Sequence, residues 1–218
     1  WTQECRTKLE DYLQTHKLPS GLGDEESACS IAAINLAITG ELTAEIPDCM
    51  SKVLGKATIV LQDAMPDKLR NSARYKALLI DMPGTGRNRE QRRMGVITAW
   101  VWDVVLPQLQ DIADEKGFGK KWRHMCEQKS EQAADAAADA AARAAARDVA
   151  DAAAYAAAYV AYAAAYVADA DAAAYAADAA ADAAAYAAAY AAGRADFWVR
   201  VDPIGVLERM TYIDGETS

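Results

Sequence analysis

The feature that most constrains the fold is an alanine-rich segment in the second half of the chain. Residues 131–192 hold 40 alanines in 62 positions, with seven tyrosines, eight aspartates and no glycine or proline. Alanine has the highest helix propensity of all residues, so a run of this length favours helix with little help from tertiary packing. As one unbroken helix it would be roughly 93 Å long, and Gly193 follows at a position typical of a helix end. We therefore predict one long helix or a helical hairpin.

Four tyrosines of this segment share one helical face. They recur three or four residues apart, at Tyr155, Tyr159, Tyr162 and Tyr166. This spacing keeps them within about 60° of one another on a helical wheel. Because an alanine-rich helix offers little apolar surface of its own, such a stripe gains stability by packing along a partner. The favoured interpretation is self-association into a closed, symmetric homo-oligomer.

Two other interpretations of the stripe stay open. The tyrosines could stack on a planar ligand such as a nucleobase. An ice-binding helix is suggested by the alanine content and by tyrosines spaced eleven residues apart, although the segment has no threonine.

Residues 1–130 have the pattern of a compact helical domain. Apolar residues recur at helical spacing between Gly and Pro interruptions, and no sustained strand-type alternation occurs. Asp24 is the predicted N-cap of the second helix, and Gly40 its end. Helices are predicted over residues 1–16, 24–39, 47–65 and 67–82, in a longer stretch after residue 88 that Pro107 kinks, and from residue 120. The expected fold class is all-α.

The last region, residues 193–218, is rich in apolar side chains for its length, including Phe197, Trp198 and Met210. We expect it to dock on a hydrophobic core, either that of residues 1–130 in the same chain or that of a neighbouring subunit. The chain is thus divided into a helical globular domain (1–130), an Ala/Tyr/Asp-rich helical segment (131–192) and a C-terminal docking segment (193–218).

Composition argues against several functions. With 23 Lys and Arg against 32 Asp and Glu, the net charge is −9, so the chain lacks the basic excess that a general nucleic-acid binder uses on phosphates. The four cysteines form no CxxC pair, which argues against a metal site and favours buried free thiols in a reducing cytoplasm. The longest uncharged run, residues 152–168, is mostly Ala and Tyr and is a poor membrane span. We expect a cytoplasmic protein without metal or cofactor.

One stretch concentrates arginine in this acidic chain. Residues 84–93 read GTGRNREQRR, which combines a glycine-rich backbone, a helix start and four arginines, the ingredients of an anion or phosphate site. The candidate ligand contacts are Arg87, Arg89, Arg92 and Arg93. The stretch is neither a P-loop nor a dinucleotide fingerprint. The alternative is a solvated helix start whose arginines pair with nearby acids. A second basic group is interpreted as a solvated helix face: Lys120, Lys121, Arg123 and His124.

No catalytic motif accompanies these features. The chain contains no GxSxG or HExxH spacing. Carboxylates that could form an acid–base pair, such as Asp48 and Asp63, are not placed on one face by any periodicity, and helix capping explains them better. We therefore expect no catalytic residues and no enzymatic activity.

Several stretches together resemble a known family. They are residues 29–37 (CSIAAINLA), 46–50 (IPDCM), 62–66 (QDAMP) and 84–87 (GTGR), with the alanine-rich segment. Across nearly the whole chain they are similar to an uncharacterised family from phage and environmental bacterial genomes. The resemblance implies a small phage-associated protein that acts in the cytoplasm of a bacterial host, and it carries over no functional residue.

The sequence thus favours a non-catalytic, phage-associated interaction protein that self-associates through its alanine-rich helix. The alternative is a module that sequesters an anionic, nucleotide-like small molecule with the arginines of residues 84–93 and the tail tyrosines. An ice-binding or other structural helix protein is the third interpretation.

Overall fold

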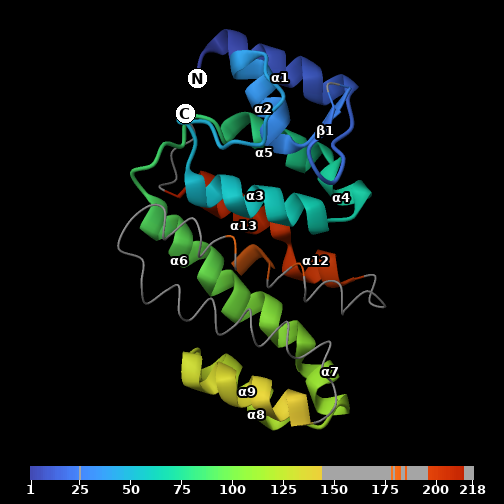
Figure 1. Ribbon diagram of the computed structural model, residues 1–218, viewed down its shortest axis with the longest axis vertical. Coiled ribbons are helices and arrows are strands. Elements are labelled where there is room, and N and C mark those ends of the chain that lie inside the picture. The colour runs from blue at the N-terminus through green and yellow to red at the C-terminus, as the bar shows by residue number, and fades with distance from the viewer. Residues whose placement is uncertain (25, 144–177, 179, 183–184, 186–195, 214–218) are drawn as a thin grey trace.

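The computed structural model describes residues 1–24, 26–143, 178, 180–182, 185 and 196–213, and these residues are predominantly helical (Figure 1). The first helices are α1 (Gln3–Thr15), α2 (Ser30–Thr39), α3 (Lys52–Ala64), α4 (Asp67–Arg70) and α5 (Ala73–Asp81). The later ones are α6 (Glu90–Trp100), the π-helical η1 (Val101–Val105), the 3-10 helix η2 (Leu106–Leu109), α7 (Gln110–Glu115), α8 (Gly119–Gln128), α9 (Glu131–Arg143), α12 (Phe197–Val201) and α13 (Pro203–Thr211). The predicted all-α class is confirmed.

Among the described residues the only strands are β1 (Gly23–Asp24) and β2 (Ser27–Ala28), which pair antiparallel with Gly23 opposite Ala28. This hairpin corrects the predicted start of the second helix. Asp24 does not cap α2, because its carboxylate accepts from the Glu26 N–H (3.0 Å) inside the turn.

Local capping explains where three of the helices begin. Thr2, Ser51 and Ser72 each accept the N–H three residues later through the side-chain oxygen, at the starts of α1, α3 and α5. Because Ser51 is the cap, α3 begins after the Pro47–Asp48 start that the sequence predicts. Gly40 ends α2 at φ 78°, as predicted.

The helices form two connected parts. In Figure 1, α1, α2 and α5 lie at one end, with α3 and then α13 beneath them. α13 packs against α3, α5 and α6, α1 packs against α2 and α5, and α8 packs against α7 and α9. The core of the first part includes Leu9, Leu13, Ile31, Ile34, Leu54, Leu61, Leu207 and Met210.

The path from α6 through η1, η2 and α7 joins the two parts (Figure 1). Pro107 lies in η2, where the helix changes type, because proline cannot donate a backbone hydrogen bond. α8 then buries Trp122, whose indole donates to the Leu106 carbonyl (3.0 Å), and Met125. Its basic side chains are exposed on the other side, which confirms the solvated face predicted there: Lys120, Lys121, Arg123 and His124.

The C-terminal residues dock on the helices of their own chain. Arg74 of α5 bonds to Asp202 (2.8 Å) and Glu208 (2.5 Å), and the Trp100 indole donates to the Val201 carbonyl (2.6 Å). Of the two sites left open by the sequence, the structure therefore uses the one in the same chain.

Most of the alanine-rich segment lies outside the described residues. The prediction of one long helix or a helical hairpin falls on that part and stays a prediction. Within the described part, α9 is helical, and Ala180 and Ala181 are buried. No described helix is both long and apolar enough to cross a bilayer.

Candidate anion-binding cleft

A cleft of about 670 Å³ lies at the start of α6. Its walls come from distant parts of the chain: Trp1 and Arg6, Asp81 at the end of α5, the loop of residues 83–89, Arg93 of α6, and residues 211–213 after α13. We call it the arginine cleft. Its volume falls within the range of about 300–1,000 Å³ typical of small-molecule sites.

The loop along one side of the cleft is held by hydrogen bonds to the residues before α3. Gly84 (φ 92°) and Gly86 (φ 60°) have left-handed backbones, which glycine adopts without strain. Both donate their N–H to the Cys49 carbonyl, at 2.9 and 3.1 Å. The Thr85 hydroxyl accepts from the Ser51 N–H (3.1 Å). The loop is thus positioned by tertiary contacts as well as by its own turn geometry.

Glu90, the first residue of α6, provides an anion for a different helix. Its carboxylate accepts from the Ser51 hydroxyl (2.5 Å) and from the N–H groups of Lys52 (2.7 Å) and Val53 (3.3 Å). The residue is only 4% exposed. A carboxylate is stabilised there because the N-terminus of α3 carries unpaired donors and the positive end of the helix dipole. This cap joins residues almost forty positions apart, and no local sequence signal reveals it.

Arg93 is buried and binds backbone carbonyls. It is 2% exposed, and its guanidinium donates to the carbonyls of Met210 (3.0 Å), Thr85 (2.9 Å) and Gly86 (3.3 Å). These bonds join the loop to the end of α13. Arg93 lines the cleft, but these carbonyls already occupy much of its capacity to donate hydrogen bonds.

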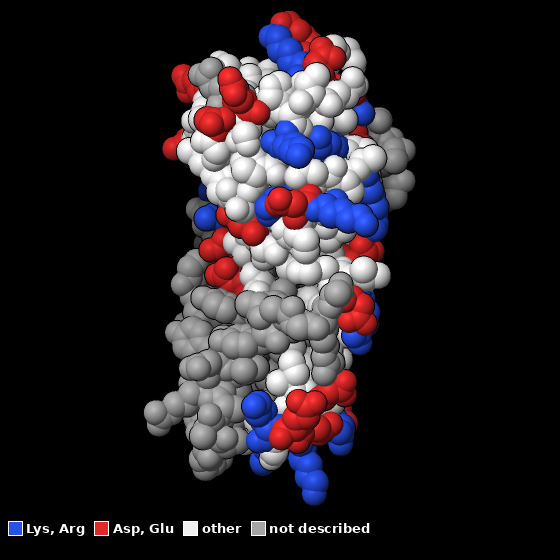
Figure 2. Space-filling model, turned by 90° about the vertical axis from the view of Figure 1, so that its right-hand side faces the viewer, with Lys and Arg blue, Asp and Glu red and all other residues white. Residues whose placement is uncertain are grey.

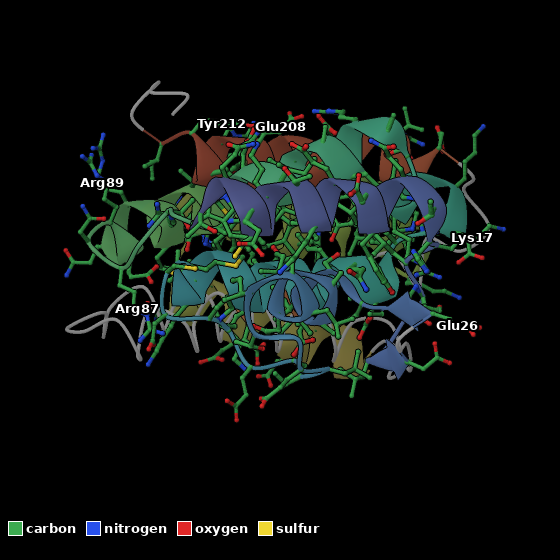
Figure 3. All side chains as sticks on the ribbon, turned by 90° about the horizontal axis from the view of Figure 1, so that it is seen from above. Lys17, Glu26, Arg87, Arg89, Glu208 and Tyr212 are labelled. Carbon is green, nitrogen blue, oxygen red and sulfur yellow. The ribbon has the colours of Figure 1, made fainter. Side chains whose placement is uncertain are left out.

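The other three arginines of the stretch occupy different places. Arg87 pairs with Asp48 (2.8 Å), whose side chain is fully exposed, and its buried Nε donates no hydrogen bond to the described residues. Arg89 lines the cleft, and Figure 3 shows its side chain at the same end of the molecule as that of Arg87 but directed to another side. Arg92 is exposed on α6 and does not line the cleft. The structure therefore brings Arg87, Arg89 and Arg93 together and leaves Arg92 outside.

A second group of cleft residues is absent from the sequence-based prediction. Arg6 of α1 donates to Asp81 (3.0 Å) and to Glu10 (3.1 Å), and the Tyr212 hydroxyl donates to the other oxygen of Asp81 (2.7 Å). Burial, followed by the hydrogen bond to Asp81, raises the pKa of Tyr212 to about 12. These residues come from three distant segments, so no spacing in the sequence could have grouped them.

The charge of the cleft contrasts with that of the chain. Four guanidinium groups and one carboxylate line it, in a protein of net charge −9. On the face drawn in Figure 2, acidic and basic side chains are interspersed instead. A cleft with an excess of one charge raises the local concentration of small ions of the opposite charge.

Two other groups of potentially reactive residues lie outside the cleft: a buried polar cluster and the cysteines. Ser30, Gln62 and Tyr75 form a hydrogen-bonded cluster between α2, α3 and α5, with each residue at most 1% exposed. All four cysteines are free thiols, but only Cys29 is buried, so the prediction of four buried thiols is wrong for the other three. Burial raises the pKa of Cys29 and brings that of Cys126 to about 11, so these two thiols are protonated near neutral pH and are poor nucleophiles. Among the described residues, no group of three or more His, Cys, Asp and Glu side chains is placed to hold a metal ion.

The predicted tyrosine stripe lies outside the described residues, and its role in oligomerisation stays a prediction: Tyr155, Tyr159, Tyr162 and Tyr166. No protein-family model, no curated protein and no solved structure matches the chain. Function is therefore inferred from the geometry of the chain itself.

Proposed function

We propose that the protein binds a small anionic molecule, bearing a phosphate or carboxylate group, in the arginine cleft. The observation that carries this proposal is the meeting of Arg6, Arg87, Arg89 and Arg93 at one cleft of about 670 Å³. Arginine recognises phosphate and carboxylate groups through paired, charge-assisted hydrogen bonds.

Arg87 and Arg89 are the proposed ligand contacts. Arg93 holds the loop through backbone carbonyls, and Arg6 is paired with Asp81 and Glu10, so both contribute mainly positive potential. Arg87 has a partner that a ligand can replace, because Asp48 is fully exposed and an exposed ion pair contributes only about 0–1 kcal/mol. The sequence favours a non-catalytic protein and offers anion binding as the alternative to self-association, so we propose binding without catalysis.

The test compares a double variant, Arg87→Ala with Arg89→Ala, with a single variant, Arg92→Ala. Calorimetric titration with inorganic phosphate and with pyrophosphate measures affinity, and thermal unfolding in excess ligand checks it by mass action. Wild type and Arg92→Ala should bind alike, and the double variant should bind at least about tenfold more weakly because charge-assisted bonds are lost. Arg92→Ala is the control, since it removes one positive charge from the same stretch but outside the cleft.

Two results would contradict the proposal. One is a wild-type protein that binds neither probe at millimolar concentration. The other is an equal loss of affinity in Arg92→Ala and in the double variant, which would indicate attraction by overall charge and no defined site.

We also propose, from the sequence pattern alone, that the alanine-rich segment mediates self-association. If so, replacing the four stripe tyrosines by serine should lower the mass of the oligomer measured by light scattering and leave residues 1–130 folded. The four substituted residues are Tyr155, Tyr159, Tyr162 and Tyr166. A wild-type protein that is monomeric at micromolar concentration would show that the tyrosines serve another role.

A further inference from the structure

The arginine cleft is lined by more than cations. Arg87 and Arg89 come from the loop, which Trp1 borders at Gly84, whereas Asp81 and Tyr212 come from the end of α5 and from the residues after α13. Figure 3 shows Tyr212 well separated from Arg87 across this end of the molecule. A ligand that fills the cleft therefore meets the loop arginines, two aromatic rings and a carboxylate that is paired with Arg6.

Asp81 is unexpected in a site for a simple anion, because its carboxylate repels phosphate. One oxygen accepts from Arg6 and the other from Tyr212, and the side chain is 34% exposed. A carboxylate offers about four lone pairs, so Asp81 has capacity to accept further hydrogen bonds. Nitrogen-bound hydrogens of a ligand would satisfy that capacity.

Trp1 and Tyr212 add aromatic surface beside this carboxylate. Trp1 is 36% exposed, and its ring lies 4.0 Å from the position that a Cβ on Gly84 would take, so the indole borders the loop. The Tyr212 ring is held in place by the bond from its hydroxyl to Asp81. Aromatic side chains at such positions bind planar rings by stacking, largely without regard to the identity of the ring.

We infer that the arginine cleft takes a ligand the size of a nucleoside monophosphate, with its phosphate at Arg87 and a planar ring bearing N–H groups near Trp1, Asp81 and Tyr212. This inference rests on the proposed function and names the class of anion. The cleft volume of about 670 Å³ is in keeping with it, since a phosphate group alone would leave most of the cleft to water.

The test uses three probes that differ by one part each: inorganic phosphate, ribose 5-phosphate and adenosine 5′-monophosphate. Calorimetric titration of the wild type should give similar affinities for the first two and at least about tenfold tighter binding of the third, because only the third stacks. Trp1→Ala should reduce this advantage and leave binding of ribose 5-phosphate unchanged.

Asp81→Asn gives the most discriminating measurement, because it should change the affinities of two probes in opposite directions. Removing the negative charge should strengthen binding of inorganic phosphate and weaken binding of adenosine monophosphate, which loses a charged acceptor. A purely structural role for Asp81 would lower both affinities together. Thermal unfolding of the variant checks that it is folded, and Tyr212→Phe, which keeps the ring and removes the hydroxyl bond, should retain most of the binding of adenosine monophosphate.

The failures of this inference and of the proposed function are distinguishable. If adenosine monophosphate and ribose 5-phosphate bind equally well to the wild type, the ring side is wrong and anion binding stands. If Asp81→Asn weakens both probes alike, the role assigned to Asp81 is likewise wrong. If none of the three probes binds, both the inference and the proposed function are overturned.

Discussion

The start of α6 and the outer face of α8 carry basic clusters that look alike in the sequence and differ in the structure. In residues 87–93, Arg93 is buried against carbonyls, and Arg87 and Arg89 line a cleft. In residues 120–124, every basic side chain is exposed, and Arg123 has a long contact of 3.6 Å with Asp114. A dense group of cations becomes a candidate site only where other segments enclose it.

Packing accounts for the difference. Among the described residues, α8 packs against α7, α9 and η2, with Trp122 and Met125 buried, and its basic residues are exposed. The loop before α6 is enclosed by the N-terminus, the end of α5 and the end of α13. The following experiments test this contrast, from the largest expected effect to the smallest.

Arg93→Ala should have the largest effect on stability. It removes the donors to three carbonyls and leaves a cavity, so we expect a loss of about 3 kcal/mol or more in the free energy of unfolding. Arg123→Ala is the matched control on α8 and should change that free energy by less than about 0.5 kcal/mol. Urea denaturation followed by circular dichroism measures both. Similar values for the two variants would remove the distinction between the clusters.

Glu90→Ala should have the next largest effect. The variant leaves the Ser51 hydroxyl and two N–H groups of α3 without their buried acceptor, and we expect a loss of about 2 kcal/mol. Glu90→Gln keeps one acceptor oxygen without the charge and should fall between Glu90→Ala and wild type. If Glu90→Ala unfolds at the same urea concentration as wild type, the cap does not stabilise α3.

High pH should lower the stability that Tyr212 contributes beside the arginine cleft. The pKa of Tyr212 is raised from its ordinary value of 10.0 to about 12, so the folded protein holds this proton more strongly than the unfolded chain does. The contribution of the protonated Tyr212 hydroxyl to the free energy of unfolding is therefore fully present below about pH 10 and is lost as the pH rises towards 12. Burial also raises the pKa of Tyr75, which acts in the same direction.

Melting temperatures measured between pH 9 and pH 12 test this expectation. Tyr212→Phe cannot ionise, so its melting temperature should decline less steeply than that of wild type over this range. Parallel declines for the two proteins would assign the alkaline loss to other groups, Tyr75 among them.

Removing charge from α8 should have the smallest effect. Lys120→Ala combined with Lys121→Ala should leave phosphate affinity within about twofold of wild type, because screening in about 0.15 M salt weakens the influence of exposed charges beyond about 8 Å. Titration at physiological ionic strength measures it. A loss comparable with that of the Arg87→Ala and Arg89→Ala double variant would place the anion site on α8.

One predicted helix, residues 67–82, is interrupted where a distant residue intervenes. Residues 67–82 have a continuous helical pattern, but the chain breaks between α4 and α5 at Asn71. The side chain of Asn71 accepts from the Leu18 N–H (2.8 Å) and donates to the Leu18 carbonyl (3.1 Å), a partner 53 positions away. Ser72 then caps a new helix. Spacing within the segment contains no information about Leu18.

Adjacent residues of the arginine stretch also differ in ways that the sequence does not predict. Arg92 and Arg93 are adjacent and chemically identical, so the sequence predicts the same role for both. One is exposed, and the other is buried because its guanidinium reaches carbonyls in the loop and at the end of α13. No feature of the sequence predicted that Arg6 and Asp81 would pair, since they meet only when α1 packs against α5.

The sequence by itself determined the all-α class, the end of α2 at Gly40 and the place where arginine is concentrated. Each of these depends on propensity, capping or composition, which act over a few residues. Only the tertiary structure decided which arginines line a cleft, which carboxylate faces them and which helix receives Glu90. Those outcomes depend on hydrogen-bond partners far along the chain, such as the Met210 carbonyl 117 positions from Arg93, and such partners are brought together only by packing.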